Sequence, residues 1–291
     1  MILPDEISFV LPAKNEEAAV GQTVGGIRAQ FPGSEIIVVD DGSTDATAEA
    51  ARDAGATVVS HPYSKGNGAA IKTGARAAKG KVLVFMDADG QHQPQEALEL
   101  LERIEQGYDM AVGARSKTGQ ASFHRGLANG FYNRLASWMV GQTVEDLTSG
   151  FRAVRADRFR AFLYLLPNGF SYPTTSTMAF FRAGYSVAYV PIRVLPRAQG
   201  STSHIRLWRD GARFLLIIFK IGTLFSPVKL FAPVSLLFFL AGLLNYAYTY
   251  FSYGRFTNMS VLMFSAAVII FLIGLISEQI TALMYKDSEE R

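Results

Sequence analysis

The chain contains no cysteine among its 291 residues. The absence of thiols excludes disulfide bonds, a thiolate zinc site and a cysteine nucleophile. Charged residues are also scarce, at 18%, whereas hydrophobic residues make up 49%. A disordered chain has the opposite balance, so a folded protein is expected. The net charge of only +3 gives no reason to expect nucleic acid as a partner.

The scarcity of charge is greatest near the C-terminus, where Arg255 is the only charged residue between positions 230 and 277. A helix needs about 20 apolar residues to cross a membrane, so this region can hold two spans. We predict transmembrane helices over residues 230–251 and 261–280, joined by a turn at 252–258. Two buried helices of a soluble core are the alternative, but such helices rarely run so long without charge.

A basic flank precedes these spans, with seven basic residues and one acid between positions 193 and 229. Such an excess is typical of the cytoplasmic side of a membrane. Within this flank, residues 206–227 mix apolar and basic side chains in a pattern that predicts an amphipathic interfacial helix, ended by Pro227. Packing of this helix against the soluble part of the chain is the alternative. The N-terminus lacks the features of a signal peptide, so we expect it in the cytoplasm.

Apolar, β-branched runs alternate with helical patterns in the N-terminal two thirds of the chain. The runs lie at residues 7–13, 35–40, 81–87 and 110–114, and the helical patterns at 16–30, 45–54, 68–78 and 94–106. This alternation predicts an α/β domain with a mainly parallel sheet. Ligands of such sheets bind beyond the carboxyl ends of the strands. These ends carry polar and charged residues here, so we expect the functional site at that edge.

Asp87-Ala88-Asp89 is the most informative of these strand ends. Alternate residues that leave a strand project to the same side, so both carboxylates can face one point. Two carboxylates without His or Cys companions are suited to Mg²⁺ or Mn²⁺, which also bind substrate phosphates. Gln91 follows two residues later and can add a neutral oxygen ligand. The alternative is an Asx-type turn with solvated side chains.

Two further segments suit a nucleotide. Asp40 and Asp41 end the second run, where carboxylates can accept hydrogen bonds from ribose hydroxyls and a base edge. The residues that follow them also suit a helix N-cap, which is the structural alternative. Residues 65–68, KGNG, precede a predicted helix, and a lysine with flexible backbone at a helix N-terminus suits a diphosphate. The glycine spacing is not that of a Walker A loop.

Together, six short motifs of this chain resemble those of the family 2 glycosyltransferases of GT-A fold. They are PAKNEE at 12–17, VDDGSTD at 39–45, KGNGAAIKTG at 65–74, DADGQH at 87–92, GAR at 113–115 and TSGFRA at 148–153. They occur in family order over nearly the whole soluble part. The chain is similar in particular to the polyprenyl-phosphate glycosyltransferases, the group that includes dolichol-phosphate mannose synthase. The Gln-x-x-Arg-Trp motif of processive polysaccharide synthases does not occur.

The resemblance implies a role for each matching residue. A UDP- or GDP-linked sugar would be bound by Pro12, Ala13, Asn15, Glu16, Asp40, Asp41, Lys65, Asp87 and Ala88. The metal, Mg²⁺ or Mn²⁺, would be bound by Asp87, Asp89 and Gln91. The lipid phosphate would be bound by Arg115, Arg125, Asn129, Arg197, Ser203, His204 and Arg206. Asp89, Arg115 and Arg125 would be the catalytic residues.

The acceptor site departs from the family pattern at one motif. The basic motif near the membrane usually reads Gly-x-Ser-Lys, whereas residues 200–204 are one residue longer and end in His204. The charge of a histidine is partial at neutral pH. Arg134 and Arg152 are further candidates for a cationic clamp on the phosphate. Asp146 lies where some family members keep an acid, and no role is assigned to it.

The expected reaction is the inverting transfer of a sugar from a nucleoside diphosphate to a polyprenyl phosphate at the cytoplasmic membrane face. A phosphate is largely ionised at pH 7, so it needs a cationic clamp more than a strong base. Another membrane acceptor, such as diacylglycerol or a polysaccharide end, would demand a true base. A non-catalytic membrane scaffold that binds nucleotide sugars is the remaining alternative.

The predicted organisation has four parts. We expect a cytoplasmic GT-A catalytic domain over residues 1–205, an amphipathic segment over 206–227, a transmembrane hairpin over 228–285 and a cytoplasmic tail over 286–291. The chain would be a multi-pass protein of the cell inner (cytoplasmic) membrane. A homo-oligomer is compatible with the resemblance.

Overall fold

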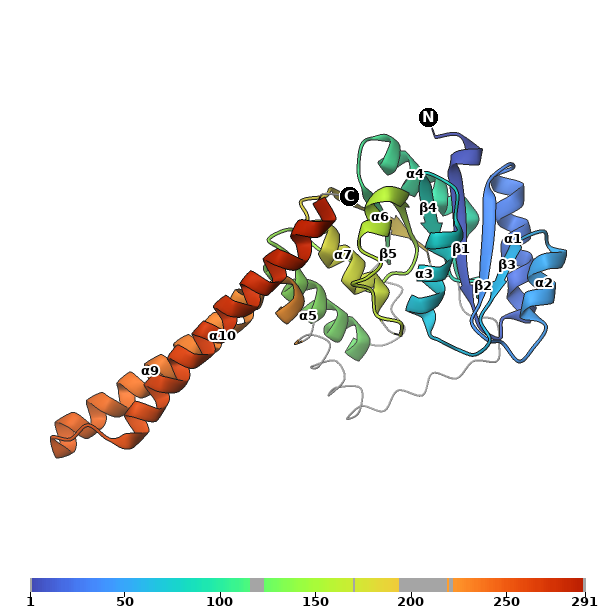
Figure 1. Cartoon of the computed structure of the whole chain (residues 1–291). Coiled ribbons are helices and arrows are strands. Elements are labelled where there is room, and N and C mark those ends of the chain that lie inside the picture. The colour runs from blue at the N-terminus through green and yellow to red at the C-terminus, as the bar shows by residue number, and fades with distance from the viewer. Residues whose placement is uncertain (1, 116–122, 170, 194–218, 220–221, 290–291) are drawn as a thin grey trace. The chain divides into compact units, whose positions relative to one another are not determined.

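A computed structural model describes residues 2–115, 123–169, 171–193, 219 and 222–289 of the chain (Figure 1). The chain forms two compact units, Met1–Ser203 and His204–Arg291.

The first unit is built on a seven-stranded sheet with the order β3-β2-β1-β4-β6-β5-β7. The strands are β1 (Ile7–Ala13), β2 (Glu35–Asp40), β3 (Thr57–Ser60), β4 (Val82–Phe85), β5 (Met110–Arg115), β6 (Arg152–Arg155) and β7 (Val187–Ile192). All neighbouring strands are parallel except that β6 runs antiparallel to both β4 and β5. The prediction of a mainly parallel sheet is therefore confirmed.

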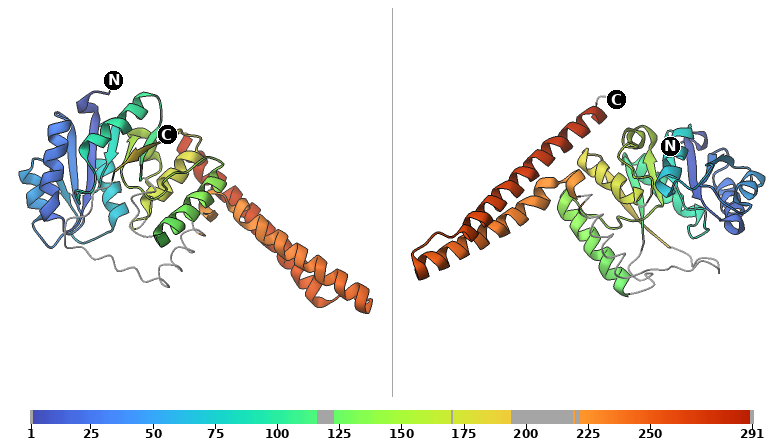
Figure 2. Two further views of the ribbon diagram at one scale, coloured as in Figure 1. Left: turned by 180° about the vertical axis from the view of Figure 1, so that it is seen from behind. Right: turned by 60° about the horizontal axis from the view of Figure 1, so that its bottom comes forward.

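Helices cover both faces of this sheet (Figures 1 and 2). They are α1 (Glu17–Gln30), α2 (Thr47–Asp53), α3 (Asn67–Ala77), α4 (Ala97–Glu105), α5 (Phe123–Val140), α6 (Ala156–Ala161) and α7 (Tyr172–Arg182), with 3-10 turns at η1 (Pro4–Glu6) and η2 (Pro94–Glu96). On one face, Phe9 of β1 belongs to a core with Val24 of α1 and Leu100 of α4. On the other face, Val10 packs against Gly74 of α3. Burial on both faces explains why the central strands are continuous apolar runs.

The sequence prediction matches β1 and β2 at both ends and places β4 and β5, but it omits β3, β6 and β7. The four residues of β3 are all partly or fully exposed, so they carry no run of buried apolar side chains. The sequence of β6 is Arg-Ala-Val-Arg, in which a buried Arg152 interrupts the apolar pattern. Short strands of this kind give no periodic signal.

The second unit contains two long helices, α9 (Pro227–Tyr253) and α10 (Asn258–Glu289). Both are long and apolar enough to cross a membrane, and the predicted spans lie inside them. The helices pack closely at glycine, since a Cβ on Gly242 would lie 3.1 Å from Cβ of Met263. The turn between the two helices is shorter than the predicted 252–258. Helix α9 continues to Tyr253, and its C-cap residue Gly254 has φ +64°. Most of the predicted amphipathic segment lies outside the described residues.

Candidate functional site

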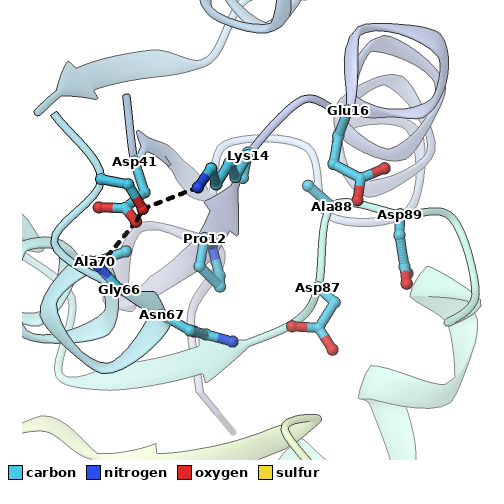
Figure 3. A pocket seen from close by; sticks show the side chains of 12 residues that line it. Pro12, Lys14, Glu16, Asp41, Gly66, Asn67, Ala70, Asp87, Ala88 and Asp89 are labelled. Carbon is cyan, nitrogen blue, oxygen red and sulfur yellow. Dashed lines mark hydrogen bonds between the residues drawn. The ribbon is translucent and has the colours of Figure 1, made fainter. Parts of the chain in front are cut away.

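A pocket of about 290 Å³ lies where β1, β2 and β4 end (Figure 3). Because β1 pairs in parallel with both β2 and β4, the segments that follow these strands meet at one edge. The pocket lining includes seven of the residues predicted for the donor and metal sites: Pro12, Ala13, Glu16, Asp41, Asp87, Ala88 and Asp89. The edge expected to carry the site therefore brings most of the predicted residues together.

Asp87 and Asp89 follow β4, and their carboxylates lie on the same side of the backbone at Ala88 (Figure 3). Asp89 is 9% exposed, and its Oδ1 accepts a hydrogen bond of 3.1 Å from the backbone N–H of Gln91. Gln91 itself is not among the residues that line the pocket. A Cβ on Gly150 would lie 3.5 Å from Oδ2 of Asp87, so this loop supports the carboxylate from one side.

Within the described part of the chain, no three His, Cys, Asp or Glu side chains form a group that could hold a metal ion. The coordination sphere of an ion bound by Asp87 and Asp89 would therefore need oxygen ligands from other sources than His, Cys, Asp or Glu side chains. Mg²⁺ and similar ions are commonly bound by one or two carboxylates together with substrate phosphates and water. Asp87 and Asp89 therefore fit Mg²⁺ or Mn²⁺ that arrives with a diphosphate.

Asp41 is buried, and its carboxylate holds the loop that follows β3. Oδ1 accepts hydrogen bonds from Nδ1 of His61 at 2.7 Å and the backbone N–H of Lys65 at 2.8 Å. Oδ2 accepts them from Oγ of Ser64 at 2.7 Å and the backbone N–H of Gly66 at 2.8 Å. Burial opposes ionisation, but these bonds outweigh it and lower the pKa of Asp41. A contact between Asp41 and the nucleotide, as predicted, would be added to these four bonds.

The predicted diphosphate site at the N-terminus of α3 lies partly against another loop of the chain. The backbone N–H of Ala69 donates to the carbonyl of Asn168 at 2.8 Å, and that of Gly68 donates to the carbonyl of Gly169 at 3.3 Å. Gly68 permits this approach, since a Cβ there would lie 2.0 Å from a backbone oxygen of the facing loop. The N–H groups of Gly68 and Ala69 are therefore satisfied by the chain itself. Gly66 and Asn67 line the pocket, and a diphosphate contact at this helix N-terminus stays a prediction.

The sequence prediction missed a cation that lines the pocket, Lys14. Its Nζ donates a hydrogen bond of 3.0 Å to Oγ of Ser64. Lys65, the predicted phosphate contact, is exposed and is not among the lining residues. Its Nζ lies 5.8 Å from the ring centre of Tyr63. The position of Lys14 directly after the end of β1 was the available signal, because polar residues at strand ends line such sites.

Asn15 lies in the loop after β1 and Asp40 is the last residue of β2, and neither lines the pocket. Oδ1 of Asn15 accepts a hydrogen bond of 2.9 Å from the backbone N–H of Thr44, and the residue has φ +55°. Oδ1 of Asp40 accepts a bond of 3.0 Å from the backbone N–H of Ser43. These bonds fix the loops after β1 and β2, and a direct contact of either residue with the nucleotide stays a prediction.

Arg115 ends β5 and forms a two-bonded ion pair with Asp146. Nε lies 2.8 Å from Oδ2, and Nη2 lies 3.0 Å from Oδ1. The bond to Asp146 raises the pKa of Arg115, and the charge of Asp87 adds to this effect. Burial alone would raise the pKa of Asp146, but the bonds from Arg115 and from nearby backbone N–H groups lower it. Arg115 is therefore held by an ionised carboxylate within electrostatic reach of the pocket.

Asp146 lies at the pocket edge of the sheet because it precedes β6, which runs antiparallel to β4 and β5. The start of β6, rather than its end, lies beside the carboxyl ends of β4 and β5. Oδ1 of Asp146 also accepts hydrogen bonds from the backbone N–H groups of Thr148 at 3.0 Å and Ser149 at 3.1 Å. The carboxylate thus shapes its own loop and orients Arg115.

Arg152 is not the surface clamp that the sequence suggested. Its side chain is completely buried, with 0% exposure. Nη1 donates to the carbonyl of Pro173 at 3.1 Å and to Oγ of Ser176 at 2.8 Å, and Nη2 donates to the carbonyl of Ser149. Burial lowers the pKa of Arg152. Arg152 therefore joins the loop before β6 to the first turns of α7 and cannot meet a lipid phosphate.

The remaining residues predicted for the lipid phosphate are placed only in part. Arg134 is exposed on α5. Arg125 and Asn129 also belong to α5, but their side chains lie outside the described part of the structure. Four more residues lie outside the described ranges: Arg197, Ser203, His204 and Arg206. Their contacts with a lipid phosphate stay predictions.

Comparisons with known proteins bear on both units. A family profile described as "Glycosyl transferase family 2" matches residues 8–163, and one described as "GtrB C-terminal hairpin" matches residues 226–283. Undecaprenyl-phosphate mannosyltransferase of Micrococcus luteus is 31% identical over 211 residues, which are 66% of this chain and 85% of that protein. Polyprenol monophosphomannose synthase of Mycolicibacterium smegmatis is 32% identical over 216 residues, 68% of this chain and 82% of that protein.

A solved structure shows the same architecture. Glucosyl-3-phosphoglycerate synthase from Mycobacterium tuberculosis, crystallised with Mn²⁺ and UDP-glucose, superposes with a TM-score of 0.60 at 25% identity. The match covers 74% of this chain and 77% of that one. The predicted GT-A fold class is confirmed.

Proposed function

The chain belongs to glycosyl transferase family 2, and we propose that it transfers a sugar from a nucleoside-diphosphate sugar to a polyprenyl phosphate at a membrane surface. Transfer in this family inverts the anomeric configuration. The observation that carries the proposal is the position of the Arg115–Asp146 pair beside the Asp87 carboxylate. A cation oriented by its own carboxylate next to a diphosphate pocket suits a second, phosphate-bearing substrate.

The donor half of the site is the pocket of about 290 Å³ at the ends of β1, β2 and β4. The ammonium group of Lys14 supplies hydrogen-bond donors to it, and Asp87 and Asp89 face it from the end of β4. Mg²⁺ or Mn²⁺ would be held by Asp87 and Asp89, with Gln91 as a further predicted ligand, and would neutralise the diphosphate as it leaves. The relatives named above and the UDP-glucose complex of the solved neighbour support this assignment.

The acceptor half is assigned to Arg115 and, by resemblance, to Arg125. A phosphate monoester carries between one and two charges at pH 7, so its oxygen is already a nucleophile. That oxygen would form a bond to the anomeric carbon while the bond from this carbon to the diphosphate breaks. Arg115 would orient the attacking phosphate, because its planar guanidinium is kept in place by Asp146.

The second unit is assigned to the membrane. Two apolar helices and the match to the hairpin family support a membrane-embedded α9–α10 pair. We place the catalytic unit and both termini in the cytoplasm and the α9–α10 turn on the other side, because the basic flank between positions 193 and 229 is typical of the cytoplasmic face.

The test is a panel of UDP- and GDP-linked sugars offered with undecaprenyl phosphate to the full chain in detergent. Mass spectrometry of the lipid fraction should show one glycosyl-phosphate product, which disappears when EDTA is added. A product formed on diacylglycerol but not on the polyprenyl phosphate would contradict the acceptor assignment. Nucleotide-sugar binding without any product on either lipid would indicate a scaffold instead of an enzyme.

A further inference from the structure

A buried histidine lies behind the wall of the nucleotide pocket. His61 follows β3 and is 7% exposed. Its Nδ1 lies 2.7 Å from Oδ1 of Asp41, and its Nε2 lies 2.9 Å from Oγ1 of Thr73 on α3. Its backbone N–H also donates to the carbonyl of Asp40 at 2.8 Å. Both ring nitrogens and the backbone of His61 are therefore bonded to fixed parts of the fold.

The partners determine how the imidazole is oriented. An ionised carboxylate can only accept hydrogen bonds, so the nitrogen that faces Asp41 carries a proton. In the neutral ring, Nε2 then accepts a hydrogen bond from the hydroxyl of Thr73. This arrangement leaves no freedom to rotate the ring without breaking a buried hydrogen bond. His61 thus supplies one of the four hydrogen bonds that orient the Asp41 carboxylate.

The orientation of Asp41 decides the shape of the pocket wall. Its two oxygens accept bonds from three consecutive residues, Ser64, Lys65 and Gly66. Ser64 and Gly66 line the pocket. Ser64 in turn accepts the 3.0 Å hydrogen bond from Nζ of Lys14. A continuous series of hydrogen bonds thus connects Thr73 in α3 to a cation at the pocket.

The neighbouring backbone makes this wall sensitive to small movements. Gly42, with φ +70°, lies so close to the loop that a Cβ there would be 2.7 Å from the backbone N of Ser64. A Cβ on Gly66 would be 2.6 Å from the carbonyl oxygen of Asn168 on the other side. The loop is confined between these two contacts, so a rotated Asp41 carboxylate cannot be followed by a smooth shift of residues 64–66.

We infer that His61 is a positioning residue for donor binding, which sets Ser64, Gly66 and Lys14 at the pocket wall by orienting Asp41. His61 touches neither substrate, and its role is confined to affinity for the nucleotide. The inference rests on the proposed nucleotide-sugar site. The role inferred for His61 does not depend on Arg115 or on the acceptor half of the site.

Two substitutions separate the two ring nitrogens. In His61→Asn, the side-chain amide reaches the position of Nδ1 and can still donate to Asp41. In His61→Gln, the amide reaches the position of Nε2 and keeps only the contact with Thr73. The two variants are similar in polarity and differ in which bond they retain. Thr73→Val is the matched control, because it removes the Thr73 hydroxyl and leaves the bond to Asp41.

The experiment measures KM for the donor, KM for undecaprenyl phosphate and kcat in the full chain, together with binding of UDP and GDP by calorimetry and the Tm of each variant. We expect His61→Gln to raise the donor KM about tenfold and to weaken nucleotide binding equally, with kcat and acceptor KM within about twofold. His61→Asn and Thr73→Val should stay within about threefold of the wild type. Equal losses in His61→Asn and His61→Gln that follow their Tm values, or an unchanged donor KM in His61→Gln, would overturn the inference.

The calorimetric arm distinguishes this inference from the proposed function. If the wild type binds a nucleotide but transfers no sugar to the lipid, the proposed function fails. A selective loss of nucleotide binding in His61→Gln would still support the role of His61, and equal binding in all variants would overturn it. A wild type that binds neither UDP nor GDP would overturn both.

Discussion

Replacement of Asp146 by asparagine isolates the orientation of Arg115 from the fold of its loop. Oδ1 of Asp146 accepts the backbone N–H groups of Thr148 and Ser149, and an asparagine Oδ1 can accept the same bonds. Oδ2, which faces Nε of Arg115 at 2.8 Å, becomes an amide NH₂ group. Two donors then face each other at Nε. Arg115 therefore loses this bond and the negative charge of its partner, while the bond from Nη2 to Oδ1 and the turn are retained.

The magnitude follows from the hydrogen bond that is lost. A hydrogen bond to a charged group contributes about 1.5–3 kcal/mol. Because the Arg115 side chain is 36% exposed, solvent screening favours the lower part of this range, about 1.5–2 kcal/mol. If Arg115 binds the acceptor phosphate, Asp146→Asn should raise KM for undecaprenyl phosphate by roughly 10- to 30-fold at saturating donor. The donor KM at saturating acceptor should be unchanged.

The control is Asp109→Asn, which weakens an ion pair of similar kind away from the pocket. Asp109 lies 3.8 Å from Nε of Arg155 and accepts hydrogen bonds from Ser186. This variant should lower the Tm without changing the acceptor KM. If Asp146→Asn behaves in the same way, with a lower Tm and an unchanged acceptor KM, the assignment of Arg115 to the acceptor phosphate is refuted.

The same pair predicts a pH dependence of stability. The pKa of Asp146 in the folded chain is below its ordinary value of 3.8, so ionised Asp146 stabilises the fold at pH values above that value. This contribution is lost as the pH falls through the lower pKa of the folded state. We expect the difference in unfolding free energy between the wild type and Asp146→Asn to be largest above pH 4 and to shrink in more acidic buffer. A difference that grows on acidification would contradict the lowered pKa.

Three further predictions concern the metal site, the core and the topology. Asp89→Ala should abolish transfer at saturating Mn²⁺ with an unchanged circular dichroism spectrum, and retained turnover would refute the metal assignment. Arg152→Met should lower the unfolding free energy by about 2–6 kcal/mol, because two buried carbonyls lose their donor, and an unchanged urea midpoint would contradict this. Ser252→Cys, the only thiol in the chain, should react with an impermeant reagent applied outside intact cells; labelling only after permeabilisation would favour a re-entrant hairpin.

The parts of the fold that could be predicted are those with a local signal. The strands at Ile7–Ala13 and Glu35–Asp40 are buried on both faces, so their apolar runs are unbroken. The two long helices lie among residues almost free of charge, and hydrophobic length alone indicates them. The Asp87-Ala88-Asp89 triplet was recognisable because alternate residues that leave a strand project to the same side.

The parts that could not be predicted depend on contacts between distant residues. At the N-terminus of α3, nothing nearby in the sequence reveals that the carbonyls of Asn168 and Gly169 accept the N–H groups of Ala69 and Gly68. Arg152 suggested a surface clamp, because arginine is rarely buried and its partners Pro173 and Ser176 lie more than 20 residues away along the chain. The pairing of Arg115 with Asp146 bridges 31 residues. Each of these contacts requires the assembled sheet.

The reversed strand β6 has a consequence for how this enzyme can diversify. Residues assigned to the sugar donor come from the first 91 positions, whereas Arg115 and Asp146 come from a later stretch that ends where β6 begins. A substitution or insertion in the later stretch can alter the acceptor while the earlier βα units keep the nucleotide. Such separation allows a lineage of enzymes to change its lipid acceptor while the residues that bind the nucleotide sugar stay the same.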